Sequence, residues 1–277
     1  MVIDCKKIAE DMIEEVRQKA SGLARSPKIV SVVVGTDGGS ESYLNMMEKT
    51  FAKVGFETEI KRLPEETTTE EAIAVIDQIN ADSGVDGCII HKPLPKQIAE
   101  GELLLRLSPD KDLDGFHPMN LGLMFAGAKN AVVPCTAQAA VEVLKRSVGN
   151  LSGKNIAVIG RSNIVGKPLS ILLLAENATV TVCHSKTRNL SEITKKADIV
   201  VVAVGSPRFL TADMVGEHSI VIDVGTNNVD GKMVGDADFA NLEGYVNMIT
   251  PVPGGVGRVT NAILLSNALT NYMKSTR

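Results

Sequence analysis

The sequence predicts an α/β protein with two α/β domains, the C-terminal one built on a doubly wound parallel sheet. In the C-terminal half, four short apolar runs alternate with segments long enough for crossover helices. That alternation is typical of parallel strands covered by helices. In the N-terminal half, two further apolar runs and one run of alternating character are separated by segments with helical periodicity. A chain of 277 residues is also long enough for about two domains.

The composition argues against several classes of protein. Hydrophobic residues make up 44% of the chain, which is enough for a sizeable core. The net charge of −4 gives no general attraction to nucleic acids or anionic membranes. Aromatic residues are only 3% and tryptophan is absent, so stacking platforms for single strands are not expected. The sequence shows no run of about 18 apolar residues and no signal peptide, so we expect a cytoplasmic protein without a membrane anchor.

The four cysteines lie far apart and form no CxxC pair. They are Cys5, Cys88, Cys135 and Cys183. In a reducing compartment such cysteines are expected to be free thiols, and no metal site is predicted.

The N-terminal half is predicted to alternate helices and strands. The expected helices are 4–24, 40–55 and 69–82, and the expected strands are 28–35, 57–63 and 85–91. Threonines at 67–69 followed by Glu70 and Glu71 mark the start of the third helix, because they can form a capping box. Gly55 is expected to end the second helix as a C-cap.

The C-terminal half carries the pattern of a nucleotide-binding sheet. The expected strands are 156–159, 179–184, 197–205 and 219–225, after a helix at 137–148 that crosses between domains. A hairpin turn is expected at 230–232, a glycine-rich loop at 249–257 and a last helix at 261–273 that returns to the first domain. We therefore predict a first domain of residues 1–136 plus 261–277 and a second of residues 137–260.

Between the first two of these strands lies a turn suited to a phosphate. The strand ends at Gly160, a polar turn follows, and Gly166 and Pro168 open a helix. Proline fits the first helical turn, and a helix N-terminus presents free N–H groups and positive dipole to an anion. The spacing is not GxGxxG, so the motif alone is weak support for a Rossmann-like dinucleotide site.

Seven stretches, in register over essentially the whole chain, together resemble one family. They are Ser40-x-x-Tyr43, Lys92–Pro95, Asp110–Gly115, Pro134–Thr136, Gly160–Pro168, Val182–Thr187 and Thr250–Gly257. The family is methylenetetrahydrofolate dehydrogenase/methenyltetrahydrofolate cyclohydrolase of the FolD type. The resemblance implies a homodimer that interconverts one-carbon tetrahydrofolate derivatives and supports purine biosynthesis. It also implies a Rossmann-like C-terminal domain that binds NADP or NAD, with folate between the two domains.

The resemblance also carries roles onto individual positions. Residues expected to bind the cofactor are Gly160, Arg161, Ser162, Ile164, Gly166, Ser185, Gly205, Thr226, Pro251, Gly254 and Gly255. Residues expected to bind folate are Ser40, Tyr43, Pro93, Asp114 and Gly255, and those expected to act in catalysis are Tyr43, Lys49, His91 and Asp114. Asp114 would accept N–H groups of the pterin, and Tyr43 would stack on it; the alternative for Tyr43 is a core aromatic. Asp110 and Asp112 are expected to be loop-capping or solvated acids, and Asp223 and Gly225 to shape the cofactor crevice.

The end of the second nucleotide-domain strand favours NADP over NAD. An NAD site usually has an acid there for the ribose 2′-hydroxyl. This chain has Cys183–Lys186 instead, and Arg161 lies in the neighbouring turn. A guanidinium can grip a 2′-phosphate with two N–H bonds, and family members that use NADP have residues matching Arg161 and Ser185 in this role. The alternative is that Arg161 and Lys186 are only surface charges.

The chain departs from the family at two positions of the hydrolytic machinery. The family pattern is Tyr-x-x-x-Lys-x-Lys, and this chain has Met47 in place of the first, catalytic lysine while Lys49 keeps the second. A glutamine of the family is His91 here. Hydride transfer needs orientation but no general base, whereas hydrolysis needs proton transfer that a thioether cannot perform. We therefore predict a dehydrogenase whose cyclohydrolase activity is weak or lost.

Two substitutes for the lysine stay open. His91 can shuttle protons if its pKa is near neutral, although a lining role against folate is the simpler interpretation. Lys92 can reach the site only if His91 does not, because successive strand residues point to opposite faces. A protein of another class, a catalytically silent folate- or nucleotide-binding protein, also remains open. An unrelated dehydrogenase is disfavoured, because Tyr43-x-x-x-Met47 lacks the tyrosine–lysine pair of short-chain enzymes.

Overall fold

The computed structural model describes residues 1–35 and 38–276, and for residues 38–43 it describes the backbone only. The chain divides into two compact units. The five-stranded unit comprises Met1–Asp11 and Pro134–Thr260, and the three-stranded unit comprises Met12–Val133 and Asn261–Arg277. The predicted boundaries differ from this division at residues 1–11 and at residues 134–136. Residues 1–11 join the five-stranded unit because Val2 bridges Ile249 and the Ile3 N–H donates to the Ile249 carbonyl at 2.9 Å.

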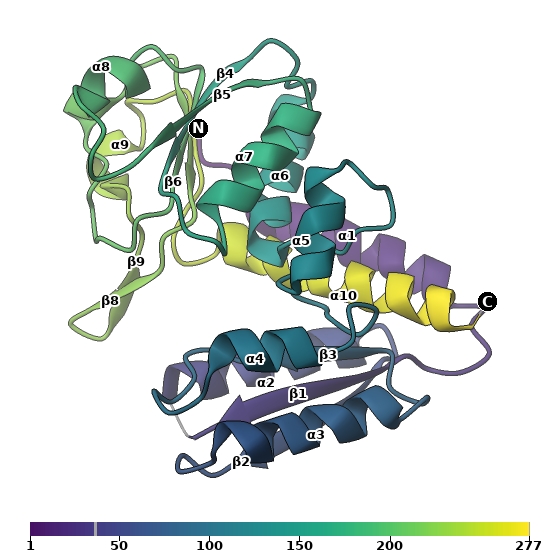
Figure 1. The fold of residues 1–277 in the computed structure, drawn as a ribbon. Coiled ribbons are helices and arrows are strands. Elements are labelled where there is room, and N and C mark those ends of the chain that lie inside the picture. Colours follow the sequence, from purple (N-terminus) through teal and green to yellow (C-terminus); the bar gives the residue numbers. More distant parts are fainter. Residues whose placement is uncertain (36–37, 277) are drawn as a thin grey trace. The chain divides into compact units, whose positions relative to one another are not determined.

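The three-stranded unit has a parallel sheet in the order β2-β1-β3 (Figure 1). Its strands are β1 (Lys28–Val34), β2 (Glu57–Leu63) and β3 (Gly87–Ile90). The helices along this half of the sequence are α1 (Cys5–Ala20), α2 (Gly38–Ala52), α3 (Thr69–Ala81), α4 (Glu100–Arg106) and α5 (Pro118–Phe125). Helices α4 and α5 were not predicted from the sequence. The capping box at the start of α3 is present, with Thr68 accepting from the Glu71 N–H and Glu71 from the Thr68 N–H.

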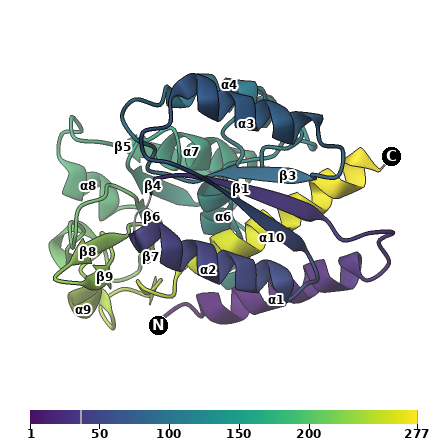
Figure 2. The same ribbon diagram turned by 90° about the horizontal axis from the view of Figure 1, so that it is seen from below.

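The two faces of this sheet pack against different helices. Val30, Val32, Cys88 and Ile90 share one buried cluster with residues of α3 and α4. Figure 2 shows α3 and α4 on one side of β1 and β3, and α2 on the other. Because strand side chains alternate, Ile89 and the following odd-numbered position belong to the face opposite α3 and α4. This alternation decides where the side chains that follow β3 point.

The five-stranded unit is the predicted doubly wound sheet. Its strands are parallel in the order β10-β7-β6-β4-β5, and they are β4 (Asn155–Ile159), β5 (Thr179–Cys183), β6 (Ile199–Val202), β7 (Ile220–Asp223) and β10 (Met248–Ile249). The helices are α6 (Cys135–Val148), α7 (Gly166–Ala175), α8 (Leu190–Thr194), the short 3₁₀ turn η1 (Ala212–Met214) and α9 (Phe239–Leu242). Strands β8 (Asn227–Val229) and β9 (Lys232–Val234) form the predicted hairpin, and α10 (Val256–Ser275) ends the chain.

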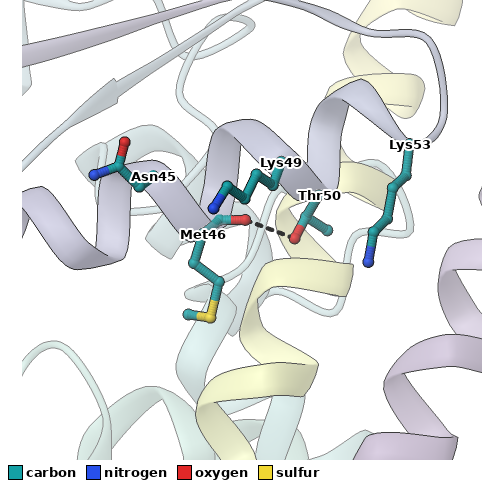
Figure 3. Close-up of a pocket in the computed structure, with 5 residues that line it drawn as sticks. All are labelled: Asn45, Met46, Lys49, Thr50 and Lys53. Atoms are coloured by element: carbon teal, nitrogen blue, oxygen red, sulfur yellow. Dashed lines mark hydrogen bonds between the residues drawn. The ribbon is translucent and has the colours of Figure 1, made fainter.

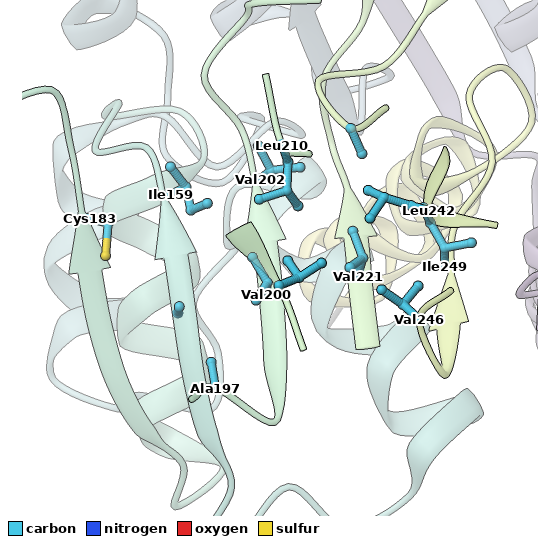
Figure 4. Close-up of a cluster of buried hydrophobic side chains, with 13 residues drawn as sticks. Ile159, Cys183, Ala197, Val200, Val202, Leu210, Val221, Leu242, Val246 and Ile249 are labelled. Carbon is cyan, nitrogen blue, oxygen red and sulfur yellow. The ribbon is translucent and has the colours of Figure 1, made fainter. Parts of the chain in front are cut away.

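The core of the five-stranded unit is aliphatic. Val200 and Val202 of β6 and Val221 of β7 are fully buried in one cluster, and Figure 4 shows Val202 beside Leu210 and Val221 beside Leu242. Burying a valine or leucine side chain stabilises the fold by about 1.5–3 kcal/mol. A strand that is buried on both faces has no amphipathic pattern, which is why β6 appears in the sequence as an unbroken apolar run.

Several predicted boundaries differ from the structure, and two of the differences lie at the cofactor edge. The third strand of this unit is shorter than expected, because Gly205 has φ +67° and turns the chain away after Val202. The last helix starts at Val256 and not at Asn261, so the glycine-rich loop is shorter than expected. Among the helices of the described residues, none combines the length and apolar content needed to cross a membrane.

Candidate active site

The predicted cofactor residues gather at one edge of the five-stranded sheet. Gly160 follows β4, Ser185 follows β5, Gly205 follows β6, Thr226 follows β7 and Pro251 follows β10. Because all five strands are parallel, their carboxyl ends lie at the same edge, where ligands of such sheets bind. The first turn also carries Arg161, Ser162, Ile164 and Gly166, and the last carries Gly254 and Gly255.

The turn after β4 can be built only with glycine at two positions. Gly160 has φ +126°, and a Cβ there would lie 2.2 Å from the Ala203 carbonyl oxygen. A Cβ on Gly166 would lie 2.1 Å from the Gly160 carbonyl oxygen. Real Cβ atoms do not approach so closely, so the two glycines let the turn after β4 touch the end of β6 and the start of α7. The result is a backbone cradle at the topological switch point of the sheet.

Ser162 stabilises this turn from within. Its Oγ accepts the Val165 N–H at 3.0 Å and the Gly166 N–H at 3.5 Å, and its carbonyl accepts the Lys167 N–H at 3.0 Å. The prediction that N–H groups of this turn are free is therefore wrong for these three. What the turn offers a phosphate is the positive end of the α7 dipole and the exposed Arg161 guanidinium.

The turn after β5 is organised by its own side chains. The His184 N–H donates to Thr187 Oγ1 at 2.8 Å, and the Lys186 N–H donates to His184 Nδ1 at 3.1 Å. These bonds leave Ser185 exposed at the tip. Within the part of the chain that the structure describes, no salt bridge engages Arg161, so its charge is available to a ligand.

Asp236, which was not predicted from the sequence, fixes the turn after β6. The fully buried Asp236 carboxylate accepts the N–H groups of Val204, Gly205 and Ser206 at 2.6, 2.9 and 2.9 Å. It also accepts from Asn227 Nδ2 at 2.8 Å. In the sequence, Asp236 stands out only as an acid shortly after the predicted hairpin turn. No sequence pattern links it to a turn some thirty residues earlier. Three N–H bonds to one carboxylate fix the backbone of this turn.

Asp223, expected to shape the cofactor crevice, makes a second network of this kind. Its Oδ1 accepts the N–H groups of Gly225 and Asp236, and its Oδ2 accepts that of Ala237 at 2.8 Å. Burial raises the pKa of Asp223 to about 6, although the backbone hydrogen bonds oppose the rise. The two acids therefore fix the backbone of the turns after β6 and β7.

The position of the missing lysine is inside the core of the three-stranded unit. Met47 is fully buried on α2, on the same helix face as the buried Leu44 and Phe51. Lys49 lies on a different face and is exposed. Figure 3 shows Lys49 beside Asn45, Met46, Thr50 and Lys53, which line an open pocket. The side chains of Ser40 and Tyr43 lie outside the described residues.

His91 follows β3 and continues its pairing, since its N–H donates to the Val32 carbonyl at 2.9 Å. Alternation places its side chain on the face of Ile89, which is the α2 face. The side chain is 8% exposed, and this burial lowers the pKa of His91 to about 4. At neutral pH the imidazole is therefore neutral and cannot act as a proton-donating imidazolium.

Lys92 points the other way, as the alternation requires. Its Nζ lies 2.6 Å from Glu100 Oε1 on α4 and 4.5 Å from the centre of the Phe116 ring. The neighbouring Pro93 is exposed. Lys92 was considered from the sequence, but its contact with Glu100 could not be predicted because α4 was not predicted.

The acidic loop holds one structural acid and one perturbed acid. Asp112 is buried and accepts the N–H groups of Gly115 at 2.9 Å and His117 at 2.8 Å, and Asn120 Nδ2 at 3.0 Å. It caps the loop, as expected. Burial, together with the nearby Asp112 charge, raises the pKa of the half-buried Asp114 to about 7, and the Lys92 charge opposes this rise. Asp110 is exposed.

The cysteines take no part in these arrangements. All four are buried and none forms a disulfide bond, and burial raises the pKa of Cys5 to about 12. Such thiols are unreactive. Across the described residues, no group of His, Cys, Asp and Glu side chains has an arrangement that could hold a metal ion.

Comparison with known families covers almost the whole chain. Residues 3–114 match the sequence model of the tetrahydrofolate dehydrogenase/cyclohydrolase catalytic domain, and residues 134–276 match that of its NAD(P)-binding domain. The chain is 48% identical over 273 residues to the bifunctional protein FolD of Rickettsia bellii, covering 97% of this chain and 96% of that protein. It is 42% identical over 272 residues to FolD of Exiguobacterium sibiricum, covering 97% and 98%.

A solved structure shows the same fold over the full length. The bifunctional FolD enzyme of Campylobacter jejuni superimposes with a TM-score of 0.95 at 37% identity, covering 99% of each chain. These matches confirm the predicted fold class and a nicotinamide dinucleotide as the cofactor of the C-terminal half. The chain belongs to the tetrahydrofolate dehydrogenase/cyclohydrolase family.

Proposed function

We propose that this protein oxidises 5,10-methylenetetrahydrofolate to 5,10-methenyltetrahydrofolate with NADP. The observation that carries the proposal is the glycine cradle after β4, at the edge where the turns that follow all five strands of the sheet meet. NADP is the cofactor in a related structure, the FolD enzyme of Trypanosoma brucei, which is 34% identical with a TM-score of 0.94 and covers 100% of this chain and 98% of that one.

The residues of the five-stranded unit fit this cofactor. Because Gly160 and Gly166 have no Cβ, which would lie within 2.2 Å of a backbone carbonyl oxygen at either position, the turn after β4 keeps a shape that suits a diphosphate. The exposed Arg161 and Ser185 suit a 2′-phosphate, because both can donate hydrogen bonds and no acid stands with them at the end of β5. When bound, the nicotinamide supplies the hydride acceptor. Pro251, Gly254 and Gly255 would allow its close approach, and Gly205 and Thr226 would border it from the turns after β6 and β7.

On the folate side, the residues orient the substrate. Asp114 would accept the N–H groups of the pterin ring, and Tyr43, Ser40 and Pro93 would line the rest of it. The oxidation step leaves a cationic methenyl product, and a nearby carboxylate favours that charge. This step asks for no proton transfer from the protein, so the replaced lysine does not prevent it.

We further propose that the hydrolysis of methenyltetrahydrofolate is weak or absent. Met47 is a fully buried thioether that cannot carry a proton. Lys49 does not replace it, because its side chain is exposed on a different face of α2 from Met47. His91 is on the α2 face but is neutral, because its pKa is lowered to about 4.

One observation favours a second candidate, a fully bifunctional enzyme. Lys92 is a half-buried cation next to the replaced glutamine, and the relatives at 42–48% identity are named bifunctional. In this version Lys92 would move the proton that the family lysine normally moves. Its ion pair with Glu100 argues against this role. The pair stabilises the charged form of Lys92, whereas a general base must be uncharged before it can accept a proton.

The deciding experiment follows NADPH and methenyltetrahydrofolate together after methylenetetrahydrofolate and NADP are mixed with the enzyme. An enzyme-free sample gives the rate of spontaneous methenyl hydrolysis. If both products rise in step and methenyl decays at the spontaneous rate, the enzyme is a monofunctional dehydrogenase. If NADPH climbs while methenyl stays low, the bifunctional candidate is correct. If neither product forms, with NAD as well, the protein is a silent binding protein.

The variant Met47→Lys then tests whether one side chain accounts for the missing activity. We expect hydrolysis above the spontaneous rate, at some cost in stability because a cation replaces a fully buried side chain. Met46→Lys is the matched control, since Met46 is exposed on the same helix. Hydrolysis that is equal in both variants would show that position 47 has no special role.

We also propose that the enzyme works as a cytoplasmic homodimer, as the family resemblance implies. Light scattering at several protein concentrations measures the assembly directly. A mass of about one chain of 29.4 kDa at all concentrations would contradict the homodimer.

A further inference from the structure

We propose that Asp236 is a positioning residue for the nicotinamide half of the dinucleotide, because it sets the backbone of the turns after β6 and β7 that this half would meet. The inference rests on the proposed function for where the nicotinamide lies, and on the five-stranded unit alone for its geometry. It assigns a role in cofactor binding to an acid that lies outside the seven stretches of family resemblance.

The order of the strands divides the cofactor edge into two halves. In the order β10-β7-β6-β4-β5, the turns after β4 and β5 lie on one side, and those after β6, β7 and β10 lie on the other. The first side carries Arg161 and Ser185, which suit the 2′-phosphate on the adenosine half of NADP. The nicotinamide half is therefore left to the second side, where Pro251 follows β10.

The side-chain oxygens of Asp236 bind the second side at two places. Oδ2 accepts the N–H groups of Val204 and Gly205 at 2.6 and 2.9 Å, in the turn after β6. Oδ1 accepts the Ser206 N–H of the same turn at 2.9 Å, and Asn227 Nδ2, directly after the turn that follows β7, at 2.8 Å. The Asp236 side chain is fully buried, so water cannot replace these bonds if they are lost.

The turn after β7 packs directly against the same carboxyl group. A Cβ on Gly225 would lie 2.1 Å from Asp236 Cγ, so only glycine allows this approach. The N–H groups of Gly225 and Asp236 both donate to Asp223 Oδ1, at 2.9 and 3.0 Å. The Asp223 N–H donates to Thr250 Oγ1 at 2.8 Å, one residue before Pro251. One connected set of hydrogen bonds therefore joins the turns after β6, β7 and β10.

The pattern of these bonds predicts how Asp236→Asn would fail. An amide has one acceptor oxygen in place of two. If that oxygen faces Val204 and Gly205, it keeps their two N–H groups. The new Nδ2 then points at two other donors, the Ser206 N–H and Asn227 Nδ2. Adding Asn227→Asp would restore one bond, because it places an acceptor opposite the new Nδ2.

The experiment compares three ligands by calorimetric titration, at a temperature below the unfolding transition of every variant. NADP and NAD occupy both halves of the cofactor edge, whereas adenosine 2′,5′-bisphosphate occupies the adenosine half alone. For Asp236→Asn we expect the affinities for NADP and NAD to fall by the same factor, about tenfold, with the affinity for adenosine 2′,5′-bisphosphate unchanged. The double variant Asp236→Asn/Asn227→Asp should recover most of the loss.

Asp238→Asn is the matched control, because this acid two residues further on accepts from Asn241 Nδ2 of α9. We expect it to bind all three ligands as the parent does. If Asp236→Asn does not fold, Asn227→Ala carries the same test, since it removes one of the four bonds to Asp236. For Asn227→Ala we expect NADP and NAD to weaken together by about threefold, again without a change for adenosine 2′,5′-bisphosphate.

The outcomes separate this inference from the proposed function. Equal losses for all three ligands, or a loss for NADP alone, would overturn the inference, because neither places Asp236 on the nicotinamide half. Unchanged NADP and NAD affinities in the variants of an active parent also overturn it, while the dehydrogenase stands. A parent that forms no NADPH from methylenetetrahydrofolate, but whose variants show the expected losses, refutes the proposed function and leaves the role of Asp236 intact.

Discussion

The cofactor edge of the five-stranded unit and the hydrolytic region of the three-stranded unit depend on different parts of the chain. At the cofactor edge, the fit depends on backbone, with Gly160 and Gly166 leaving no room for a side chain. In the hydrolytic region, the chemistry that the family resemblance implies would depend on two side chains, and Met47 and His91 stand at those positions. The fold of each unit matches the family, so the fold alone does not tell which activity survives.

The difference teaches how an enzyme of two activities can lose one. A backbone cradle is part of the sheet and cannot be lost without disturbing β4, β6 and α7 together. A catalytic side chain can be exchanged at little cost to the fold when the new side chain packs well, and Met47 is fully buried. Selection on stability therefore protects the first site and does not protect the second.

The largest effect is expected from a methyl group in the cradle. Gly160→Ala places a Cβ 2.2 Å from the Ala203 carbonyl oxygen at φ +126°. We expect NADP affinity to fall at least about a hundredfold, which corresponds to about 3 kcal/mol, together with a lower Tm. Calorimetric titration with NADP and thermal unfolding measure both. Gly101→Ala is the control, because a Cβ there meets nothing within 4 Å. If Gly160→Ala binds NADP as tightly as the parent, the cofactor edge does not depend on its backbone and does not differ from the hydrolytic region in this respect.

A smaller effect is expected where the cofactor edge does use a side chain. Arg161→Ala should weaken NADP about ten- to a hundredfold, because charge-assisted hydrogen bonds contribute about 1.5–3 kcal/mol, while NAD binding should hardly change. The affinities for both cofactors are compared with those of Lys167→Ala, whose ammonium already bonds Asn163 in the same turn. Equal losses for NADP and NAD would remove the 2′-phosphate role of Arg161.

The smallest effect concerns His91 and appears only in acid. The folded-state pKa of His91 is lowered to about 4, so below pH 6.5 the unfolded chain binds a proton that the folded protein does not. Stability contributed at neutral pH is therefore lost as the pH falls from about 6.5 towards 4. Between pH 7.5 and pH 5 the loss should be about 2 kcal/mol, and His91→Gln should remove it.

Denaturant unfolding at the two pH values measures this loss. His218→Gln is the control, because His218 is exposed. A parent protein and a His91→Gln variant with equal pH dependence would show that His91 is not held neutral. The case against His91 as a substitute acid would then be open again.

Much of the fold could be predicted from the sequence because it depends on local signals. The apolar runs placed β1 and β4, and an alternating run placed β2, within a residue or two of their observed ends, and the Thr68–Glu71 capping box marked the start of α3. The short helices α4 and α5 were missed because they carry too few turns for a clear period. The shortened β6 was missed because the apolar run continues beyond the residues that pair.

For the site, the sequence determined which residue types stand where, and the tertiary structure decided what they can do. Methionine in place of lysine, and the order of turns along the chain, are visible in the printed sequence. Only packing decided that Asp236 binds the turn after β6, that His91 is neutral, and that Lys92 meets Glu100 and Phe116. These contacts join residues distant in sequence, and burial, which sets a pKa, is a property of the packed chain.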